Sequence, residues 1–180
     1  MYSVDSRESK SVRLRIAQRE DAEAITTVIN SAFRGAEQFF VERDRVDVAD
    51  VLNFLSSGKF LLAESEHTLL GCVYVEPGHV DSNRSAAEFQ DCAYLGLLAV
   101  GPAHQKSGLG SMLMDAAEDY CRALGVRFMN IKVVNLREEL AGFYRKRGYV
   151  ETGTSAFPAE VETTLPCHFI DMSKPLDLKH

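Results

Sequence analysis

The sequence predicts one α/β (α+β) domain, a mixed β-sheet of about six to seven strands with helices on both faces. Apolar segments follow one another in the order strand, helices, three strands, helix, strand, helix and two strands, which builds a sheet covered by helices. A length of 180 residues, with 46% hydrophobic and 26% charged residues, suits a single globular domain. We expect this domain at 12–174, between a flexible tail at 1–11 and a short tail at 175–180.

The first half of the domain contains alternating and helical apolar patterns separated by turns. Arg19-Glu20-Asp21 opens the first helix, and Ser56-Ser57-Gly58 forms a turn before the next strand. The long segment 77–90 has no periodicity, and we expect a mobile loop there. The predicted elements are a strand at 12–16, helices at 19–33 and 46–55, and strands at 59–64 and 69–76.

The central unit is a strand, a glycine loop and a helix. The apolar run 92–100 is too short for a membrane span and predicts a buried strand. Gln105-Lys106-Ser107-Gly108-Leu109-Gly110 follows, and then apolar residues recur every three or four positions to Leu124, as in an amphipathic helix. Such a loop presents backbone N–H groups and the positive end of a helix dipole, which suit a pyrophosphate. No Walker A sequence is present.

The last third predicts a strand at 127–134, a helix ending at Gly148, and strands at 149–154 and 167–172. Asn135 precedes the helix, and Glu138 follows it by three positions. This spacing predicts that Asn135 is the N-cap of a capping box.

Three features together resemble the GNAT superfamily of N-acetyltransferases. The loop matches its Gln/Arg-x-x-Gly-x-Gly/Ala motif, and Leu98-Ala99-Val100 matches the apolar-Ala-Val bulge that precedes it. Downstream, Asn135 and the run Phe143-Tyr144-Arg145-Lys146-Arg147-Gly148-Tyr149 match the family's Asn and its aromatic-Tyr-x-x-x-Gly-Tyr/Phe sequence. The resemblance implies the GNAT fold, in which the parallel strands 92–100 and 127–134 splay apart to admit coenzyme A.

The same resemblance implies site residues and a reaction. Tyr144 would be the catalytic acid beside the coenzyme sulfur, and acetyl-CoA would be the cosubstrate. Residues implied to bind it are Leu98, Ala99, Val100, Gln105, Lys106, Ser107, Gly108, Leu109, Gly110, Ser111 and Asn135. The implied activity is acetyl transfer to a primary amine of a small molecule or peptide, by direct attack in a ternary complex. The alternative is a non-catalytic acyl-CoA-binding or regulatory module.

The attacking amine must lose a proton, which requires a base. Lysine-acetylating members often place Glu where this chain has Tyr94, so a histone-type activity is disfavoured. Glu76, Asp91 and Glu64 remain candidate bases, and spacing does not choose among them. Phe39 and Phe40 either pack under a loop or, by resemblance, wall the acceptor site. Acidic residues near them faintly favour a cationic acceptor: Glu37, Glu42, Asp44, Asp47 and Asp50.

Charge and composition exclude other classes. A net charge of −6 disfavours nucleic acid as a partner, and no apolar run long enough for a membrane anchor or signal peptide is present. The four cysteines and five histidines show no metal-ligand spacing, so no metal is predicted. We expect a cytoplasmic protein, and a homodimer is left open.

Overall fold

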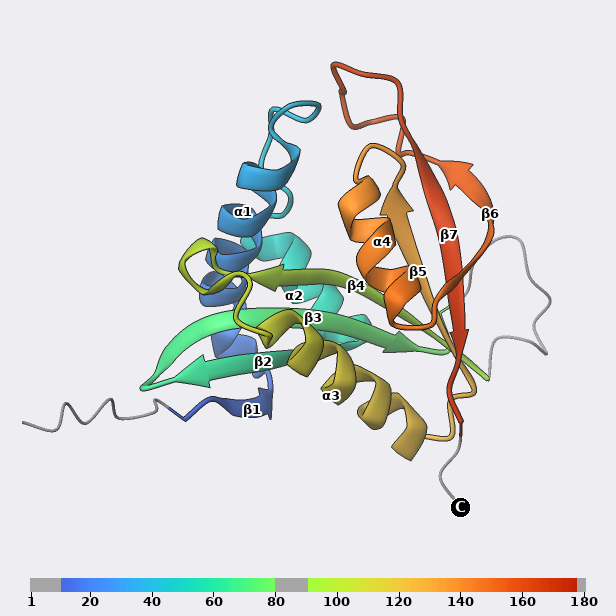
Figure 1. The fold of residues 1–180 in the computed structure, drawn as a ribbon. Helices are drawn as coiled ribbons and strands as arrows, with labels where there is room; N and C mark the ends of the chain where they lie inside the picture. Colours follow the sequence, from blue (N-terminus) through green and yellow to red (C-terminus); the bar gives the residue numbers. More distant parts are fainter. Residues whose placement is uncertain (1–10, 80–90, 178–180) are drawn as a thin grey trace, which may run out of the picture.

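The computed structural model describes residues 11–79 and 91–177. Its centre is a mixed sheet with the strand order β1-β2-β3-β4-β5-β7-β6 (Figure 1). Neighbouring strands run antiparallel except β4 and β5, which are parallel. The strands are β1 (Arg13–Ile16), β2 (Lys59–Ser65), β3 (Thr68–Pro77), β4 (Cys92–Val100), β5 (Phe128–Val134), β6 (Val150–Ala156) and β7 (His168–Pro175).

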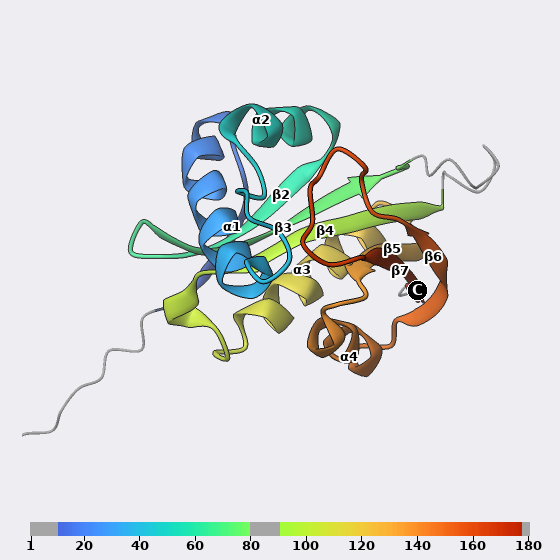
Figure 2. The same ribbon diagram turned by 90° about the horizontal axis from the view of Figure 1, so that it is seen from above.

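Helices cover both faces of the sheet (Figure 2). One face carries α1 (Ala22–Glu37) and α2 (Val48–Ser57), and the other carries α3 (Leu109–Ala123) and α4 (Glu138–Lys146). The α1 side buries Ile25 and Ile29 against aromatic residues of β2 and β3, whereas the α3 side buries Leu113 and Met114. This arrangement confirms the predicted fold class, including helices on both faces.

The helices begin and end close to the predicted boundaries. Asp47 and Asp50 form a capping box that starts α2, since each carboxylate accepts the other residue's backbone N–H. Helix α1 continues four residues beyond its predicted end, to Glu37, which is buried on the inner face. A charged residue on that face hid the last turn from the apolar pattern.

The structure describes only parts of the predicted tails and of the predicted loop. Residues 1–10, 80–90 and 178–180 lie outside the described part of the chain, and with them most of the segment predicted as a mobile loop. At the other end, β7 includes Pro175, and Leu176 is buried with its N–H donating to the Arg127 carbonyl at 2.7 Å. Ordered structure therefore continues past position 174. None of the described helices is long and apolar enough to cross a membrane.

Candidate active site

The parallel strands β4 and β5 pair along only part of their length. Their register contains three pairs, from Cys92 opposite Phe128 to Tyr94 opposite Asn130. Beyond these pairs β4 continues to Val100 and β5 continues to Val134, but the two strands no longer pair with each other. The strands therefore separate halfway along the sheet, leaving the backbone of the second half of β4 facing a gap.

A β-bulge in β4 accounts for the separation. Gly96 pairs with Tyr74 of β3 and Ala99 pairs with Cys72, so Leu97 and Leu98 together stand opposite one residue of β3. Leu97 has a φ of 50°, in the left-handed region that β-branched and bulky residues rarely adopt. An extra residue bends its strand and increases the local twist, which turns the end of β4 away from β5.

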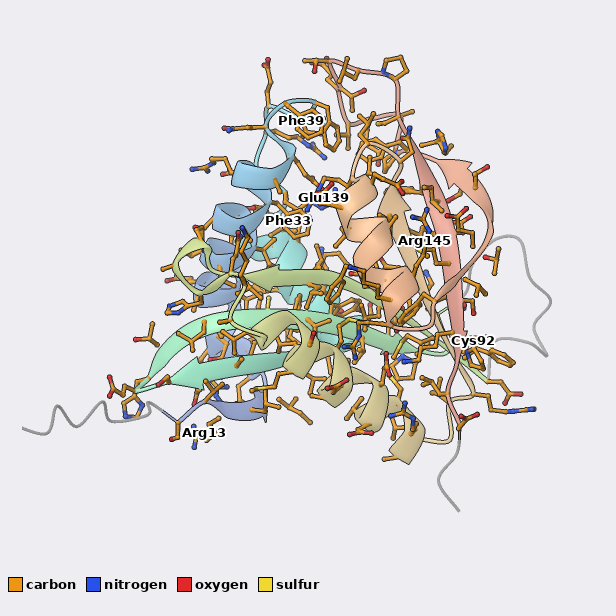
Figure 3. The ribbon with its side chains drawn as sticks, viewed as in Figure 1. Arg13, Phe33, Phe39, Cys92, Glu139 and Arg145 are labelled. Atoms are coloured by element: carbon orange, nitrogen blue, oxygen red, sulfur yellow. The ribbon has the colours of Figure 1, made fainter. Side chains whose placement is uncertain are left out.

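A slot-like pocket of about 190 Å³ opens where the strands separate. Phe33 lies between α1 and α4 (Figure 3), so the pocket runs between helices from opposite faces of the sheet. Its lining is mainly apolar, with one arginine. The residues are Ala32, Phe33 and Ala36 of α1, Leu98 and Val100 of β4, Gln105 of the loop, and Arg137 and Leu140 near the start of α4.

The glycine loop leaves the start of α3 open. Gly108 is the N-cap residue with φ 85°, so no side chain caps the helix, and the first turn contains no acidic residue. Met112 makes the first helical hydrogen bond, to the Gly108 carbonyl at 3.0 Å, which leaves the N–H groups of residues 109–111 without a helical partner. A Cβ atom built on Gly110 meets nothing within 4 Å. This helix terminus is therefore an accessible group of N–H donors with a positive dipole.

The remaining loop residues hold the loop in shape. The N–H of Gly101 donates to the Leu70 carbonyl at 2.8 Å, tying the loop to β3. The Gln105 side chain donates to the Val100 carbonyl at 3.3 Å, and the Ser107 hydroxyl donates to the His104 carbonyl. Lys106 is exposed with a φ of 61°. Leu109 is buried under α3, so it offers a ligand only its backbone.

Tyr144 belongs to α4, the helix whose start lines the pocket. Its side chain is buried, and its ring packs edge-to-face on Phe143 and Tyr149, with centroids 5.3 and 5.6 Å away. Its hydroxyl has no hydrogen-bond partner among the described residues. Burial, reinforced by the neighbouring Tyr94, raises the pKa of the Tyr144 phenol above its usual value. Tyr144 therefore keeps its proton at neutral pH and can donate it in a hydrogen bond.

The predicted N-cap role of Asn135 is wrong. Helix α4 begins at Glu138, and its N-cap position is Arg137, so Glu138 is the first helical residue and not the third. Asn135 instead pairs with His168 of β7: the His168 N–H donates to Asn135 Oδ1 at 2.9 Å, and the Asn135 N–H donates to the His168 carbonyl at 3.0 Å. Asn135 therefore extends the pairing of β5 with β7, and its side-chain oxygen is not available to cap α4.

The three candidate bases lie in different places. Glu64 is bonded to Arg13 and Arg15 at the β1 side of the sheet, far from the gap in strand order. Asp91 precedes β4, at the strand end away from the loop. Glu76 pairs in register with Tyr94, where β4 and β5 separate, and its carboxylate accepts from the Tyr74 hydroxyl at 2.9 Å. Only Glu76 of the three lies beside the gap.

The basic run at the end of α4 serves the fold. Arg145 forms ion pairs with Glu138 and Glu151, at 2.6 and 2.5 Å. Arg147 pairs with Asp115 of α3 at 2.5 Å. Both arginines therefore pair with carboxylates of the fold.

Sequence reasoning missed a buried ion pair across the pocket. Glu37 of α1 is buried, and Arg137 lies 3.6 Å from its carboxylate. Burial raises the pKa of Glu37, while Arg45 and Arg137 act against that shift. A signal existed, since Glu37 follows Ile25, Ile29 and Phe33 at intervals of four on one helix face.

The aromatic pair after α1, Phe39 and Phe40, contacts the segment between β6 and β7. Phe40 is fully buried, and its ring contacts Phe157 at 6.5 Å, whereas Phe39 is half exposed. Thr164 donates to both of their carbonyls, from its N–H to Phe40 at 2.9 Å and from its hydroxyl to Phe39 at 3.1 Å. These contacts join the segment after α1 to the segment between β6 and β7.

Within the described residues, no three His, Cys, Asp or Glu side chains gather in a metal-binding group.

Comparison with known proteins gives the same assignment. The model of the acetyltransferase (GNAT) family matches residues 22–149. A putative phosphinothricin N-acetyltransferase structure is 22% identical, with a TM-score of 0.73 over 93% of this chain and 99% of that chain. The putative acetyltransferase yncA from Salmonella typhimurium, solved with acetyl-CoA, is 21% identical, with a TM-score of 0.70 over 94% and 96%.

A ribosomal-protein-alanine N-acetyltransferase from Brucella melitensis is 19% identical, with a TM-score of 0.71 over 91% of this chain and 99% of that chain. No curated protein sequence matches significantly. At these identities the solved structures show the shared fold, and the family model covers well over half of the sequence. The chain belongs to the acetyltransferase (GNAT) family.

Proposed function

We propose that this protein is an acetyl-CoA-dependent N-acetyltransferase, in which a primary amine attacks the thioester directly in a ternary complex. The observation that carries the proposal is the occurrence of three features around one gap. These are the open start of α3, the slot beside Leu98 and Val100 of β4, and the buried phenol of Tyr144 on α4, the helix whose start lines the slot.

The coenzyme fits this gap by its chemistry. Its diphosphate takes the N–H groups of residues 109–111, and Gly110 lets the phosphate approach because a side chain there would occupy the same space. The pantetheine arm lies against Leu98 and Val100 and pairs with the backbone of β4, as an added strand would. Lys106 adds positive charge near the phosphates, and the Asn135 side-chain amide lies at the end of β5 on the other wall.

Chemistry follows at the point where the strands separate. A lysine-like amine with a pKa of about 10.4 costs about 4.6 kcal/mol to deprotonate at pH 7, so a base is needed. Glu76, through water, takes that proton, since it lies one strand from the gap. A backbone N–H near Leu98 polarises the thioester carbonyl. The amine nitrogen bonds to the carbonyl carbon and the carbon–sulfur bond breaks, while Tyr144 hydrogen-bonds the departing thiolate. The nitrogen then gives up its extra proton, and the sulfur leaves as the CoA thiol with one proton.

Two measurements test the proposal in sequence. Calorimetry with acetyl-CoA tests the coenzyme site, and release of CoA thiol against a panel of primary amines tests transfer. We expect binding, and turnover that depends on the amine. Absence of binding removes the assignment altogether. Binding without turnover of any amine supports the non-catalytic acyl-CoA-binding module instead.

A further inference from the structure

Arg45 belongs to the segment between α1 and α2, and α1 fixes its backbone. Asn30 Oδ1 accepts from the N–H groups of Arg45 and Val46, at 3.0 and 3.1 Å. The same side chain donates to the Val46 carbonyl at 2.8 Å. Val46 is buried, and the capped start of α2 follows at once. The guanidinium of Arg45 therefore extends from an anchored backbone.

The guanidinium of Arg45 lies beside the slot. Its carbon is 5.3 Å from the ring centroid of Phe33, and Phe33 lines the slot with Leu98. It is also near Tyr94, because its charge lowers the pKa of that phenol against the dominant effect of burial. Tyr94 is the last β4 residue before the gap. Arg45 therefore reaches from the α1 side toward the position where acetyl transfer would occur.

No carboxylate forms an ion pair with Arg45 in residues 11–79 and 91–177. Other arginines nearby are paired: Arg34 with Asp44, and Arg137 with Glu37 and Glu139. A partly buried guanidinium without a counter-ion is unfavourable. Its planar set of donors matches a carboxylate in two parallel hydrogen bonds. The charge of Arg45 also acts on the Glu37 carboxylate, but Glu37 pairs with Arg137 at 3.6 Å, so Arg45 has no carboxylate of its own within ion-pair distance in the described residues, and a ligand can supply one.

A hydrogen-bond acceptor lies next to Tyr94 on β5. Asn130 is the register partner of Tyr94 on β5, so both side chains lie on the same face of the sheet. The Asn130 Oδ1 atom is buried and has no hydrogen-bond partner in the described part of the chain. An amine N–H is the kind of group that would satisfy it. A cation and a hydrogen-bond acceptor therefore flank Tyr94.

The acidic residues that suggested a cationic acceptor are mostly engaged elsewhere. Asp47 and Asp50 cap α2, Asp44 pairs with Arg34, and Glu37 faces Arg137. This leaves Glu42, which is exposed on the outer part of the segment. Arg137, which lines the slot, is paired with Glu37, so Arg45 is the arginine beside the slot that has no ion pair among the described residues.

We propose that Arg45 binds a carboxylate of the acceptor, so that the acceptor is an amino acid or a similar amine that carries an acid group. Asn130 holds the amine of the same molecule. This inference rests on the proposed N-acetyltransferase function. It excludes polyamines and lysine side chains as preferred acceptors, because neither places a carboxylate near the reacting amine.

The test compares acids with their uncharged counterparts. CoA release is measured at saturating acetyl-CoA with glycine, β-alanine, 4-aminobutanoate, L-leucine and L-methionine, and with the amide of each. We expect at least one acid to exceed its amide 100-fold or more in kcat/KM. Arg45→Gln should lower kcat/KM for that acid at least 50-fold and for its amide less than threefold. Arg45→Lys should retain part of the preference. Arg43→Gln is the matched control, an exposed neighbour with the same charge change, and should alter neither.

Two outcomes overturn the inference. Amides as good as their acids in the native protein remove the carboxylate from recognition. Equal loss for acid and amide in Arg45→Gln shows that Arg45 only supports the fold. If acetyl-CoA binds but no amine is acetylated, the proposed function fails separately. The N-acetyl derivatives of the same acids and amides are then titrated into the CoA complex. Selective binding of the acids that Arg45→Gln abolishes supports the inference, and its absence overturns it.

Discussion

Tyr144 and Tyr149 provide a matched test of the proposed chemistry. Their rings are 5.6 Å apart and both are buried, but only Tyr149 has a hydrogen-bond partner in the described chain, the Glu118 carboxylate at 3.2 Å. A hydrogen bond to a charged group contributes about 1.5–3 kcal/mol. The Tyr144 hydroxyl would make such a bond only to the departing thiolate. Tyr144→Phe should therefore lower kcat about 10- to 150-fold, at 1.36 kcal/mol per factor of ten.

For stability the order of the two variants should be reversed: Tyr149→Phe should lose more stability than Tyr144→Phe. Tyr144→Phe loses no hydrogen bond within the described structure, so the free energy of unfolding should change by no more than about 0.5 kcal/mol. Tyr149→Phe loses the bond to Glu118 and should cost about 2 kcal/mol, or about 4–8 °C in melting temperature. Stopped-flow or steady-state CoA release, urea unfolding and acetyl-CoA titration measure these effects. Unchanged kcat in Tyr144→Phe, or equal losses of kcat in both variants, would refute the role of the Tyr144 phenol.

Three further predictions concern binding, stability and pH. Gly110→Val places a branched side chain where the phosphate would lie, so the KM for acetyl-CoA should rise at least tenfold with the melting temperature nearly unchanged. An unaltered KM would contradict diphosphate binding at the start of α3. Glu118→Ala removes a buried carboxylate and should cost about 3–5 kcal/mol in urea unfolding, whereas Asp115→Asn, exposed at the surface, should cost less than about 1 kcal/mol. The hydrogen bond from Arg15 lowers the pKa of Asp21, so its stabilisation is present above the unfolded pKa of about 3.9 and is lost as pH falls through the folded value. Thermal unfolding from pH 6 to pH 2 should therefore depend less on pH in Arg15→Met than in the native protein.

Local sequence patterns predicted the elements and the loop because their causes are local. Spacings of three and four placed the inner face of α3, and alternation placed β1. Each of these depends on residues within one or two turns of one another. The family resemblance added the separation of the two parallel strands, which the register of β4 and β5 confirms.

Polar side chains were assigned less well, because their partners are distant in sequence. Asn135 has the spacing of a helix cap, but its side-chain oxygen accepts the backbone N–H of His168 in β7 instead. Glu64, Asp91 and Glu76 were equivalent as candidate bases until the strand order placed only Glu76 beside the gap.

By itself the sequence determined the order of helices and strands, the glycine loop before α3, and a resemblance to the GNAT family that rests on this loop together with the bulge before it and the aromatic run after it. Tertiary structure decided which charges lie near the gap between β4 and β5, with Arg45 against Phe33 and without an ion pair in the described chain, and Glu37 paired with Arg137. The physical reason is range. Backbone conformation follows from neighbours a few residues away, whereas the charge of a site depends on ion pairs between residues up to one hundred positions apart.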